Sequence, residues 1–266
     1  MIRILNENDR DLVLNYLYME SSYNIFIIGD IEAFGFHTVF QYILGEFDEL
    51  DNILSVFLKY RDNGIYYSHL NRFNPDFFDY IKLEELNFFS AKSKLMDLIK
   101  PYLNLFKERQ MFFCKANKIK AKPYLKDIEI KRITSLDECY RLYDLLSNIK
   151  EFGIFRRNKE EFANAHYKSL KMGTTFYIEE NKKIISTVTT TAETKKSAMI
   201  IAVATDSNYR GRGYVSTLLI KLMEYYFNIK KKELCLFYDN LEAGKIYLKL
   251  GFEHMGKWTT FERVNH

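Results

Sequence analysis

The sequence predicts an α/β protein with two domains, each built around a mixed β-sheet. Three observations lead to this prediction. The chain has 266 residues, which favours two domains at roughly 100 to 200 residues per domain. Strand-like and helix-like hydrophobic patterns alternate along both halves. A lysine-rich segment at 117–124 contains a proline and is typical of a linker, so we expect domains at residues 1–122 and 123–266.

The first half predicts two helices among several strands. A helix is expected at about 11–19, because Leu12, Val13, Tyr16 and Leu17 share one helical face. Runs rich in β-branched and aromatic residues indicate strands. The strands are expected at 40–47, 53–60 and 65–69, followed by a helix at 93–103 and a strand-like segment at 111–115.

The second half gives a longer alternation of the same kind. It opens with a strand at 128–133 and two helices at about 136–146 and 159–172, and further strands are expected at 174–179, 184–191 and 198–205. Apolar residues from Val215 onward lie on one helical face. After a strand at 234–238 comes a helix that Gly251 ends, and then a strand-like segment at 252–264.

A faint internal repeat relates the two halves. Shifting the sequence by 128 positions places Ile2, Asp9, Leu14 and Leu17 on Ile130, Asp137, Leu142 and Leu145, and Asn6 on Thr134. Both stretches predict a short strand followed by a capped helix. We infer a duplicated fold whose first copy has diverged.

Composition excludes several classes of protein. Apolar residues make up 47% of the chain and charged residues 28%, which is typical of a globular protein and not of a disordered one. The apolar run at 198–204 is far shorter than the roughly 20 residues of a membrane helix, and the N-terminal residues carry mixed charges instead of a signal-peptide core. We expect a cytoplasmic protein with no membrane contact.

Cysteine, histidine and charge set further expectations. Three cysteines at wide spacings predict neither a disulfide framework nor a zinc site, and the five histidines lack ligand spacing, so no metal is expected. Residues 1–122 carry 15 basic and 17 acidic side chains, whereas residues 123–266 carry 24 and 18. A cationic second half suits an anionic ligand, but it lacks the dense basic stripe that nucleic-acid binding needs.

One segment has the composition of an anion-binding site. The apolar strand at 198–205 leads to Gly211 and Gly213, which open the helix that follows. Glycines let backbone N–H groups converge, and a helix N-terminus adds unpaired N–H groups and a positive dipole end. The segment therefore predicts a phosphate or pyrophosphate site, although a tight turn without a ligand has the same pattern.

The spacing argues against two common phosphate loops. A Walker loop needs Gly-Lys followed by Ser or Thr, but Tyr214 and Val215 follow Gly213. The dinucleotide fingerprint needs a third glycine where Ser216 stands, and its first glycine close to the strand. Asp239, at the end of the next strand, keeps a dinucleotide site open as a lesser alternative.

Two motifs resemble one known family. Arg210-Gly-Arg-Gly-Tyr-Val215 resembles the Gln/Arg-x-x-Gly-x-Gly/Ala loop of the GNAT superfamily of acyl-CoA N-acyltransferases, and Asn240-Leu-Glu-Ala-Gly-Lys-Ile-Tyr-Leu-Lys-Leu-Gly-Phe252 resembles its Asn-x-x-Ala-x-x-x-Tyr-x-x-x-Gly-Phe signature. The resemblance covers about 128–264. It implies tandem acyl-CoA N-acyltransferase-like domains, of which the N-terminal one is degenerate. Val215 departs from the usual small residue, and we expect its side chain to point away from the pyrophosphate.

The resemblance implies a role for each matching residue. Main-chain groups of Val203, Ala204 and Thr205 would pair with the pantetheine arm of acetyl-CoA, in a slot opened where this strand splays from the one at 234–238. Asn240, with Ala243 in the same motif, would bind the arm from the other side, and Tyr247 would face the thioester sulfur. The pyrophosphate would lie against Arg210, Gly211, Arg212, Gly213, Tyr214, Val215 and Ser216.

The implied reaction is direct attack of a primary amine on acetyl-CoA. The N–H of Val203 would stabilise the oxyanion, and Tyr247 would give or share a proton with the departing thiolate. Tyr247 could instead be a core tyrosine. For the base, Glu151 and Glu193 are the only candidates that the sequence offers, and for each of them a surface carboxylate is the favoured interpretation.

The acceptor and the role of the first half stay open. A small molecule or a peptide could supply the amine, and the oligomeric state cannot be read from the sequence. Residues 65–152 contain no glycine, so we expect the first half to bind no CoA and to shape the acceptor cleft or serve as a structural partner. A CoA-binding module without turnover is the main alternative function.

Overall fold

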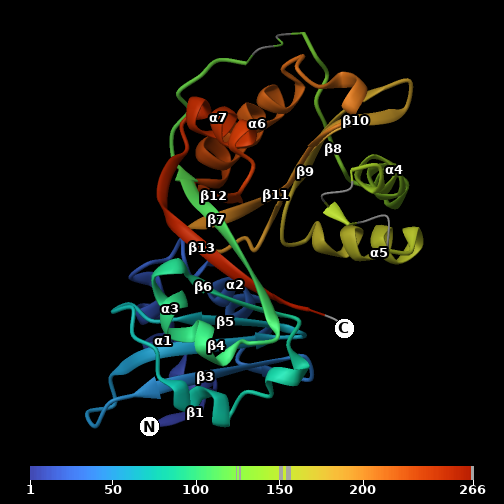
Figure 1. Cartoon of the computed structure of the whole chain (residues 1–266). Coiled ribbons are helices and arrows are strands. Elements are labelled where there is room, and N and C mark those ends of the chain that lie inside the picture. The colour runs from blue at the N-terminus through green and yellow to red at the C-terminus, as the bar shows by residue number, and fades with distance from the viewer. Residues whose placement is uncertain (124, 126, 150–151, 154–156, 265–266) are drawn as a thin grey trace. The chain divides into compact units, whose positions relative to one another are not determined.

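The structure is a computed structural model that describes residues 1–123, 125, 127–149, 152–153 and 157–264 (Figure 1). It divides into two units. The N-terminal unit contains Met1–Phe113, Phe237–Asp239 and His254–His266, and the C-terminal unit contains Cys114–Leu236 and Asn240–Glu253. The last part of the sequence therefore belongs to the first unit.

The N-terminal unit is a mixed sheet in the strand order β1-β3-β4-β5-β6-β13-β7, with β2 beside β3. β5 and β6 are parallel, whereas β1 with β3, β3 with β4, β4 with β5 and β6 with β13 pair antiparallel. Its strands are β1 (Ile2–Ile4), β2 (His37–Thr38), β3 (Gln41–Phe47), β4 (Ile53–Tyr60), β5 (Asn63–Tyr67), β6 (Phe88–Lys92), β7 (Phe106–Ala116) and β13 (Glu253–Arg263). The last three residues of β7 and the first residue of β13 belong to the C-terminal unit. Its α-helices are α1 (Arg10–Tyr18), α2 (Ile25–Phe34) and α3 (Met96–Ile99).

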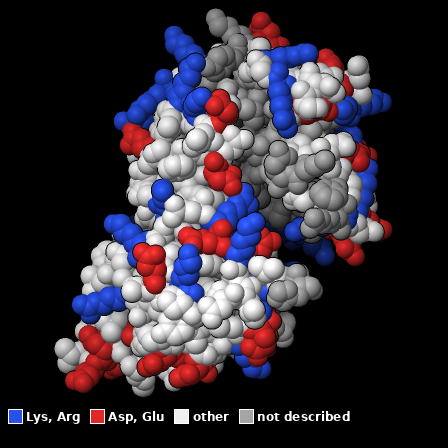
Figure 2. All heavy atoms as spheres, viewed as in Figure 1, with Lys and Arg blue, Asp and Glu red and all other residues white. Residues whose placement is uncertain are grey.

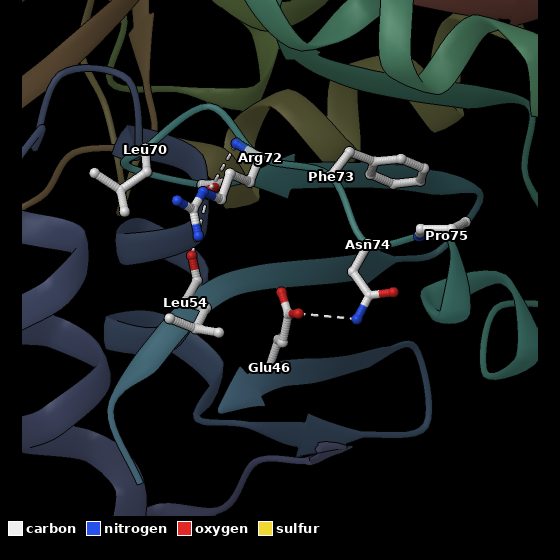
Figure 3. A pocket seen from close by; sticks show the side chains of 8 residues that line it. Glu46, Leu54, Leu70, Arg72, Phe73, Asn74 and Pro75 are labelled. Atoms are coloured by element: carbon white, nitrogen blue, oxygen red, sulfur yellow. Dashed lines mark hydrogen bonds between the residues drawn. The ribbon is translucent and has the colours of Figure 1, made fainter. Parts of the chain in front are cut away.

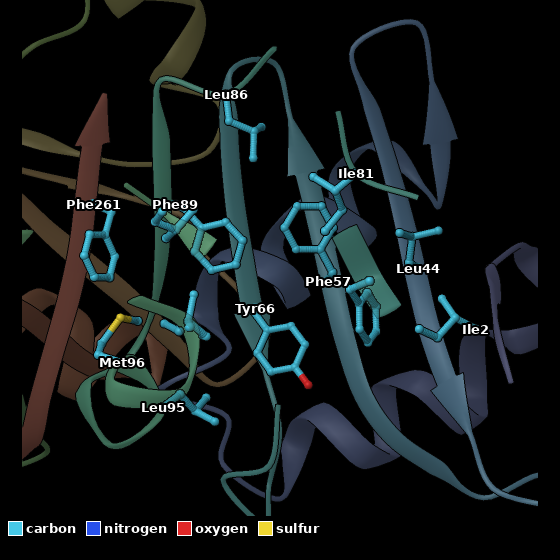
Figure 4. Packing of buried hydrophobic residues seen from close by; sticks show 14 residues of the cluster. Ile2, Leu44, Phe57, Tyr66, Ile81, Leu86, Phe89, Leu95, Met96 and Phe261 are labelled. Atoms are coloured by element: carbon cyan, nitrogen blue, oxygen red, sulfur yellow. The ribbon is translucent and has the colours of Figure 1, made fainter. Parts of the chain in front are cut away.

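Both faces of this sheet are covered. On one face, α1 and α2 pack against β3, β4 and β5. The contact includes Val13 and Ile28 of the helices and Ile43 and Val56 of the strands. On the other, α3 and short 3₁₀ turns cover a cluster that includes Phe57, Phe89 and Phe261 (Figure 4). Phe261 lies on β13, so the C-terminal strand contributes to this core.

The sequence predictions for this unit hold in part. The helix at 11–19 and the strands at 40–47 and 53–60 are confirmed within a residue or so. The helix predicted at 93–103 is wrong as one element: it is two 3₁₀ turns around the four-residue α3, and Pro101 stands in the second turn. α2 and β6 were not predicted. α2 is apolar around most of its circumference, with Ile25, Ile27, Ile28 and Ile31 buried, so it lacks amphipathic periodicity.

The strands of the C-terminal unit are also mixed in direction and have the order β12-β11-β10-β9-β8. β11 and β12 are parallel, whereas β10 with β11, β9 with β10 and β8 with β9 pair antiparallel. Its strands are β8 (Lys131–Arg132), β9 (Thr175–Glu180), β10 (Lys183–Thr191), β11 (Ser197–Thr205) and β12 (Glu233–Tyr238), of which the last two residues of β12 belong to the N-terminal unit. Its helices are α4 (Leu136–Ser147), α5 (Lys159–Ser169), α6 (Tyr214–Glu224) and α7 (Leu241–Leu250).

Helices cover this sheet on both faces as well. α4 and α5 pack on one face over Tyr177, Ile184 and Ala204, and α6 packs on the other against β9, β10 and β11 (Figure 1). A π-helix, Tyr225–Lys230, continues α6. The elements predicted for this half are confirmed, except that β8 is only two residues long.

The two units share their opening motif. Asn6 and Ser135 each form a capping box, with Asp9 and Glu138 respectively. These pairs, and the buried residues Val13 with Leu142 and Leu17 with Leu146, are all related by a shift of 129. The predicted shift of 128 is therefore one residue too short at this motif, because it aligned Asn6 with Thr134 instead of the cap Ser135.

Two features are absent from the described residues. No helix among them is long and apolar enough to cross a bilayer. No group of three or more His, Cys, Asp or Glu side chains in the described part of the chain is arranged to hold a metal ion. The three cysteines are buried and form no disulfide, and burial raises the pKa of Cys114 to about 12 and of Cys139 to about 11.

Candidate functional site

The end of β11 is irregular where the pantetheine arm was expected. The parallel ladder with β12 runs from Ser197↔Glu233 to Ile200↔Leu236, and β11 continues for five more residues. On its other side, β10 pairs Thr189 with Ile201 and Thr187 with Ala204, so Ala202 and Val203 together oppose one residue of β10. This is a β-bulge, which bends a strand and re-aims its peptide groups, and bulges are common beside active sites.

Ala202 marks the bulge in the backbone torsions. Its φ is +49°, a left-handed conformation that costs a residue with a Cβ about 1 to 3 kcal/mol and that clusters at functional sites. Ile201, beside it, is 42% exposed although it lies within a strand. The ladder with β12 ends early, as a splay of the two strands requires. The bulge was not predicted from the sequence, since Ala-Val-Ala gives no signal for a left-handed residue.

The loop after β11 is held by local hydrogen bonds. Asp206 accepts from the N–H of Asn208 at 3.0 Å and from Lys183 Nζ at 2.6 Å. Arg210 Nε donates to the carbonyl of Thr205 at 3.2 Å, and Arg212 donates to that of Asn208 at 3.1 Å. The two arginines are exposed, so the loop presents two cations without an acidic ion-pair partner among the described residues.

The glycines have the conformation that the sequence predicts. Gly211 has a φ of +77° and Gly213 a φ of +83°. A Cβ built on Gly211 would meet no described heavy atom within 4 Å, which leaves open space where a ligand was expected. Gly213 is the N-cap of α6.

The N-terminus of α6 is suited to bind an anion. Gly213 has no side chain to cap the helix, and the first turn carries no acidic residue. The first backbone bond joins the N–H of Thr217 to the carbonyl of Gly213 at 3.0 Å. The N–H groups of Tyr214, Val215 and Ser216 are therefore the donors that the helix itself does not satisfy, and the helix dipole favours negative charge at this end.

α7 carries the second motif and packs against α6. Asn240 is its N-cap, and Oδ1 accepts from the N–H groups of Glu242 and Ala243 at 2.9 and 3.3 Å. Its Nδ2 is thus the part of the amide that remains to donate to a ligand. Gly251, with a φ of +118°, ends the helix as predicted.

Tyr247 lies on the buried side of α7. Its side chain is 7% exposed, and burial raises the pKa of its phenol to about 12. Its ring is 6.0 Å from that of Phe252 in an edge-to-face arrangement. The phenol is therefore protonated at neutral pH and can act as a donor, while its packing also fits the core role considered above.

Of the two candidates for the base, Glu151 and Glu193, the structure describes only Glu193. Glu151 lies outside the described residues. Glu193 accepts from Lys232 at 2.6 Å, from Lys230 at 3.1 Å and from Tyr226 at 3.0 Å. Burial alone would raise its pKa, but these donors outweigh burial and lower the pKa of Glu193, so its carboxylate is a structural ion-pair partner and a poor proton acceptor.

From the sequence, His166 was considered only as a metal ligand, and no role was assigned to it. It lies on α5, where Nε2 is 3.0 Å from Thr175 Oγ1. Burial lowers its pKa to about 4, which makes this imidazole neutral at pH 7 and too weak a base to hold a proton from an alkylammonium group.

The dinucleotide alternative loses its acidic residue. Asp239 accepts from Arg109 Nε at 2.8 Å and from Nη2 at 2.6 Å, within the N-terminal unit. The sheet of the C-terminal unit is mainly antiparallel, unlike the parallel sheet of a dinucleotide-binding fold.

Comparison with known proteins agrees with the motifs. A family model described as the acetyltransferase (GNAT) family matches residues 139–252, which include the glycine loop and α7. Residues 139–252 belong to the GNAT acetyltransferase family. Comparison with curated proteins finds no match.

Solved structures extend the similarity to the whole fold. A GCN5-related N-acetyltransferase from Sphaerobacter thermophilus has a TM-score of 0.67 at 12% identity, covering 100% of this chain and 96% of that one. A GCN5-related N-acetyltransferase-like protein from Streptococcus suis has a TM-score of 0.59 at 15% identity, with coverages of 97% and 99%. A tandem GNAT protein from the clavulanic acid biosynthesis pathway has a TM-score of 0.58 at 10% identity, with coverages of 98% and 97%. The predicted fold class, tandem GNAT-like domains of mixed α/β topology, is confirmed.

Proposed function

We propose that the GNAT domain transfers an acetyl group from acetyl-CoA to the primary amine of a small molecule or peptide. The observation that carries the proposal is the left-handed glycine loop after the bulged end of β11. This loop leads into the N-terminus of α6, which no side chain caps. Backbone donors, two exposed arginines and the helix dipole there all favour a pyrophosphate.

The proposed binding mode follows the strand. Val203, Ala204 and Thr205 pair with the pantetheine arm through their main chain, as an added strand would. Residues 210–216 hold the pyrophosphate, and the Nδ2 of Asn240 donates to the arm. This arrangement delivers the thioester beside the bulge and Tyr247.

The chemistry needs the amine in its neutral form. An alkylammonium group with a pKa near 10.4 is neutral in only one molecule in a few thousand at pH 7, a gap of about 4.6 kcal/mol. A base, for which Glu151 is the candidate, or a chain of water molecules takes that proton. The amine nitrogen then attacks the thioester carbon, and the N–H of Val203 stabilises the oxyanion that forms. The C–S bond then breaks and the CoA thiolate leaves.

Tyr247 assists the leaving group. A thiol has a pKa of about 8.5 in water, well below the value of about 12 for Tyr247. Full proton transfer from Tyr247 to a solvated thiolate is therefore uphill, and we propose that the phenol shares its proton in a hydrogen bond that strengthens as negative charge develops on sulfur.

The test is turnover with a panel of amines. The protein is incubated with acetyl-CoA, primary amines of several classes and a thiol reagent, and CoA release is followed. Release that depends on the amine supports the proposal. Saturable CoA binding with no amine-dependent release for any acceptor would favour the alternative, a CoA-binding module without turnover. Glu151→Gln should lower turnover at pH 7 without changing CoA affinity.

A further inference from the structure

The N-terminal unit contains a pocket of about 240 Å³ (Figure 3). It is lined by residues of β3 and β4 and by the segment that follows β5. Its polar lining includes the carboxylate of Glu46 and the guanidinium of Arg72, and its apolar lining includes Leu54, Leu70 and Phe73. The volume equals that of about eight water molecules, which is room for a ligand of roughly nine or ten heavy atoms.

The loop that forms one wall is tied down by hydrogen bonds. Ser68 Oγ donates to the carbonyl of Leu54 at 3.3 Å and accepts from the N–H of Arg72 at the same distance. The hydroxyl of the buried Tyr66 donates to the carbonyl of Arg72 at 3.1 Å. The wall is thus anchored to strands β4 and β5, which gives the pocket a fixed shape.

Neither of the two charged side chains of the pocket forms an ion pair within the described residues. Glu46 accepts from Ser55 Oγ at 2.5 Å and from Asn74 Nδ2 at 2.8 Å, one neutral donor on each carboxylate oxygen. These bonds fix the carboxylate in place and leave a lone pair on each oxygen. Neither Glu46 nor Arg72 forms an ion pair with any residue that the structure describes.

One wall of the pocket, the loop 68–74, follows β5 in the first repeat as the glycine loop follows β11 in the second. β5 is parallel to β6, and their ladder ends at Ile65↔Ser90 before β5 itself ends, as the ladder of β11 with β12 ends early. The chain then enters the loop 68–74, which contains no glycine and leads into a 3₁₀ turn of only five residues. It therefore lacks both features that suit a pyrophosphate, and it offers one fixed anion and one cation in their place.

We infer that this pocket binds a free amino acid with an apolar side chain. Glu46 accepts from the α-ammonium group of the ligand, and Arg72 donates to its carboxylate, for which the planar guanidinium is well suited. Leu54, Leu70 and Phe73 contact the apolar side chain. The ligand would thus supply each of these two side chains with a close ion-pair partner.

Calorimetric titration with L-leucine tests the inference on the full-length protein. Two analogues remove one charge each: isopentylamine lacks the carboxylate, and 4-methylpentanoate lacks the ammonium group. Leucine should bind saturably, and each analogue should bind at least tenfold more weakly, since a hydrogen bond to a charged group contributes about that factor or more.

Variants assign the charges. Glu46→Gln should weaken leucine binding at least tenfold but leave the affinity for 4-methylpentanoate unchanged. Arg72→Met should also weaken leucine binding at least tenfold but leave the affinity for isopentylamine unchanged. Glu49→Gln and Lys107→Met are the matched controls and should change nothing, because both side chains are exposed and form no ion pair with the described residues of the same unit. Thermal unfolding checks that Glu46→Gln still folds, and the exposed Arg72 gives a second variant that does not touch the core.

The outcomes are decisive for this site alone. No saturable heat with leucine, or leucine affinity that survives both Glu46→Gln and Arg72→Met, would overturn the inference. Because the glycine loop lies in the other unit, replacing Gly213 should not change leucine affinity, so failure of the proposed acetyltransferase activity leaves this test intact.

Discussion

Replacing Gly213 by alanine should weaken CoA binding about 5- to 30-fold. Gly213 has a φ of +83° at the N-cap of α6, and an L-residue in the left-handed region costs about 1 to 2 kcal/mol. The surrounding loop is largely exposed, so the variant should relax to a negative φ and turn the N–H groups away. Regaining the binding conformation then costs that same 1 to 2 kcal/mol, which corresponds to the stated factor at 25 °C.

Gly211→Ala should weaken CoA by at least as much. Its φ of +77° carries the same torsional penalty, and its Cβ enters the open space where the ligand was placed. The assay is calorimetric titration with CoA, alongside thermal unfolding of each variant.

Gly35→Ala is the matched control for the glycine variants. Gly35 also has a φ of +77° but lies in the N-terminal unit, and its Cβ would meet only the flexible end of Glu7. This variant should lose stability while CoA affinity stays unchanged. Folded Gly213→Ala protein with the CoA affinity of the natural protein would refute the assignment of the loop.

Three further predictions concern side chains of the C-terminal unit. Tyr247→Phe should lower kcat about 100-fold and leave the KM for acetyl-CoA within a factor of two, because the ring stays buried; an unchanged kcat would make Tyr247 a core residue. Glu193→Gln should lower the melting temperature but not kcat, since Lys230 and Lys232 hold this carboxylate; lost turnover in folded protein would restore it as a base. For Glu138, burial raises the pKa, but donors including Tyr177 and Ser135 outweigh burial and lower it to about 2. Its stabilisation is therefore complete above its ordinary pKa of about 4.5 and lost as the pH falls toward 2. Glu138→Gln should cost about 1 kcal/mol in denaturant unfolding at pH 7, and a penalty that did not shrink in acid would contradict this account.

The C-terminal unit could be predicted because its signals are local. The glycine spacing, the cap Asn240 and the terminating Gly251 each act within a few residues of the structure that they specify. The bulge at Ala202 could not be predicted, because it depends on how β11 pairs with two neighbouring strands, and alanine itself has no preference for a left-handed conformation.

Tertiary context decided the features that were missed in the first half. α2 is buried on most sides, so the polar face that would reveal a helix is absent. The pairing of β13 with β6 joins residues about 170 positions apart, from Trp258↔Lys92 to Glu262↔Phe88, and no short-range pattern encodes such a partner. Basic and acidic side chains intermingle on the face shown in Figure 2, so the net charge of each half did not indicate where a ligand binds.

The order of synthesis gives β13 a further importance. The ribosome synthesises residues 1–113 long before it reaches Trp258 and Phe261. The sheet and the core of the first unit therefore remain incomplete while the second unit is being synthesised. Nascent chains halted before residue 254 should therefore expose an open sheet edge to proteases and chaperones. Dividing the gene at the linker would place β6 in one fragment and β13 in the other. The two fragments would therefore not fold independently as complete units.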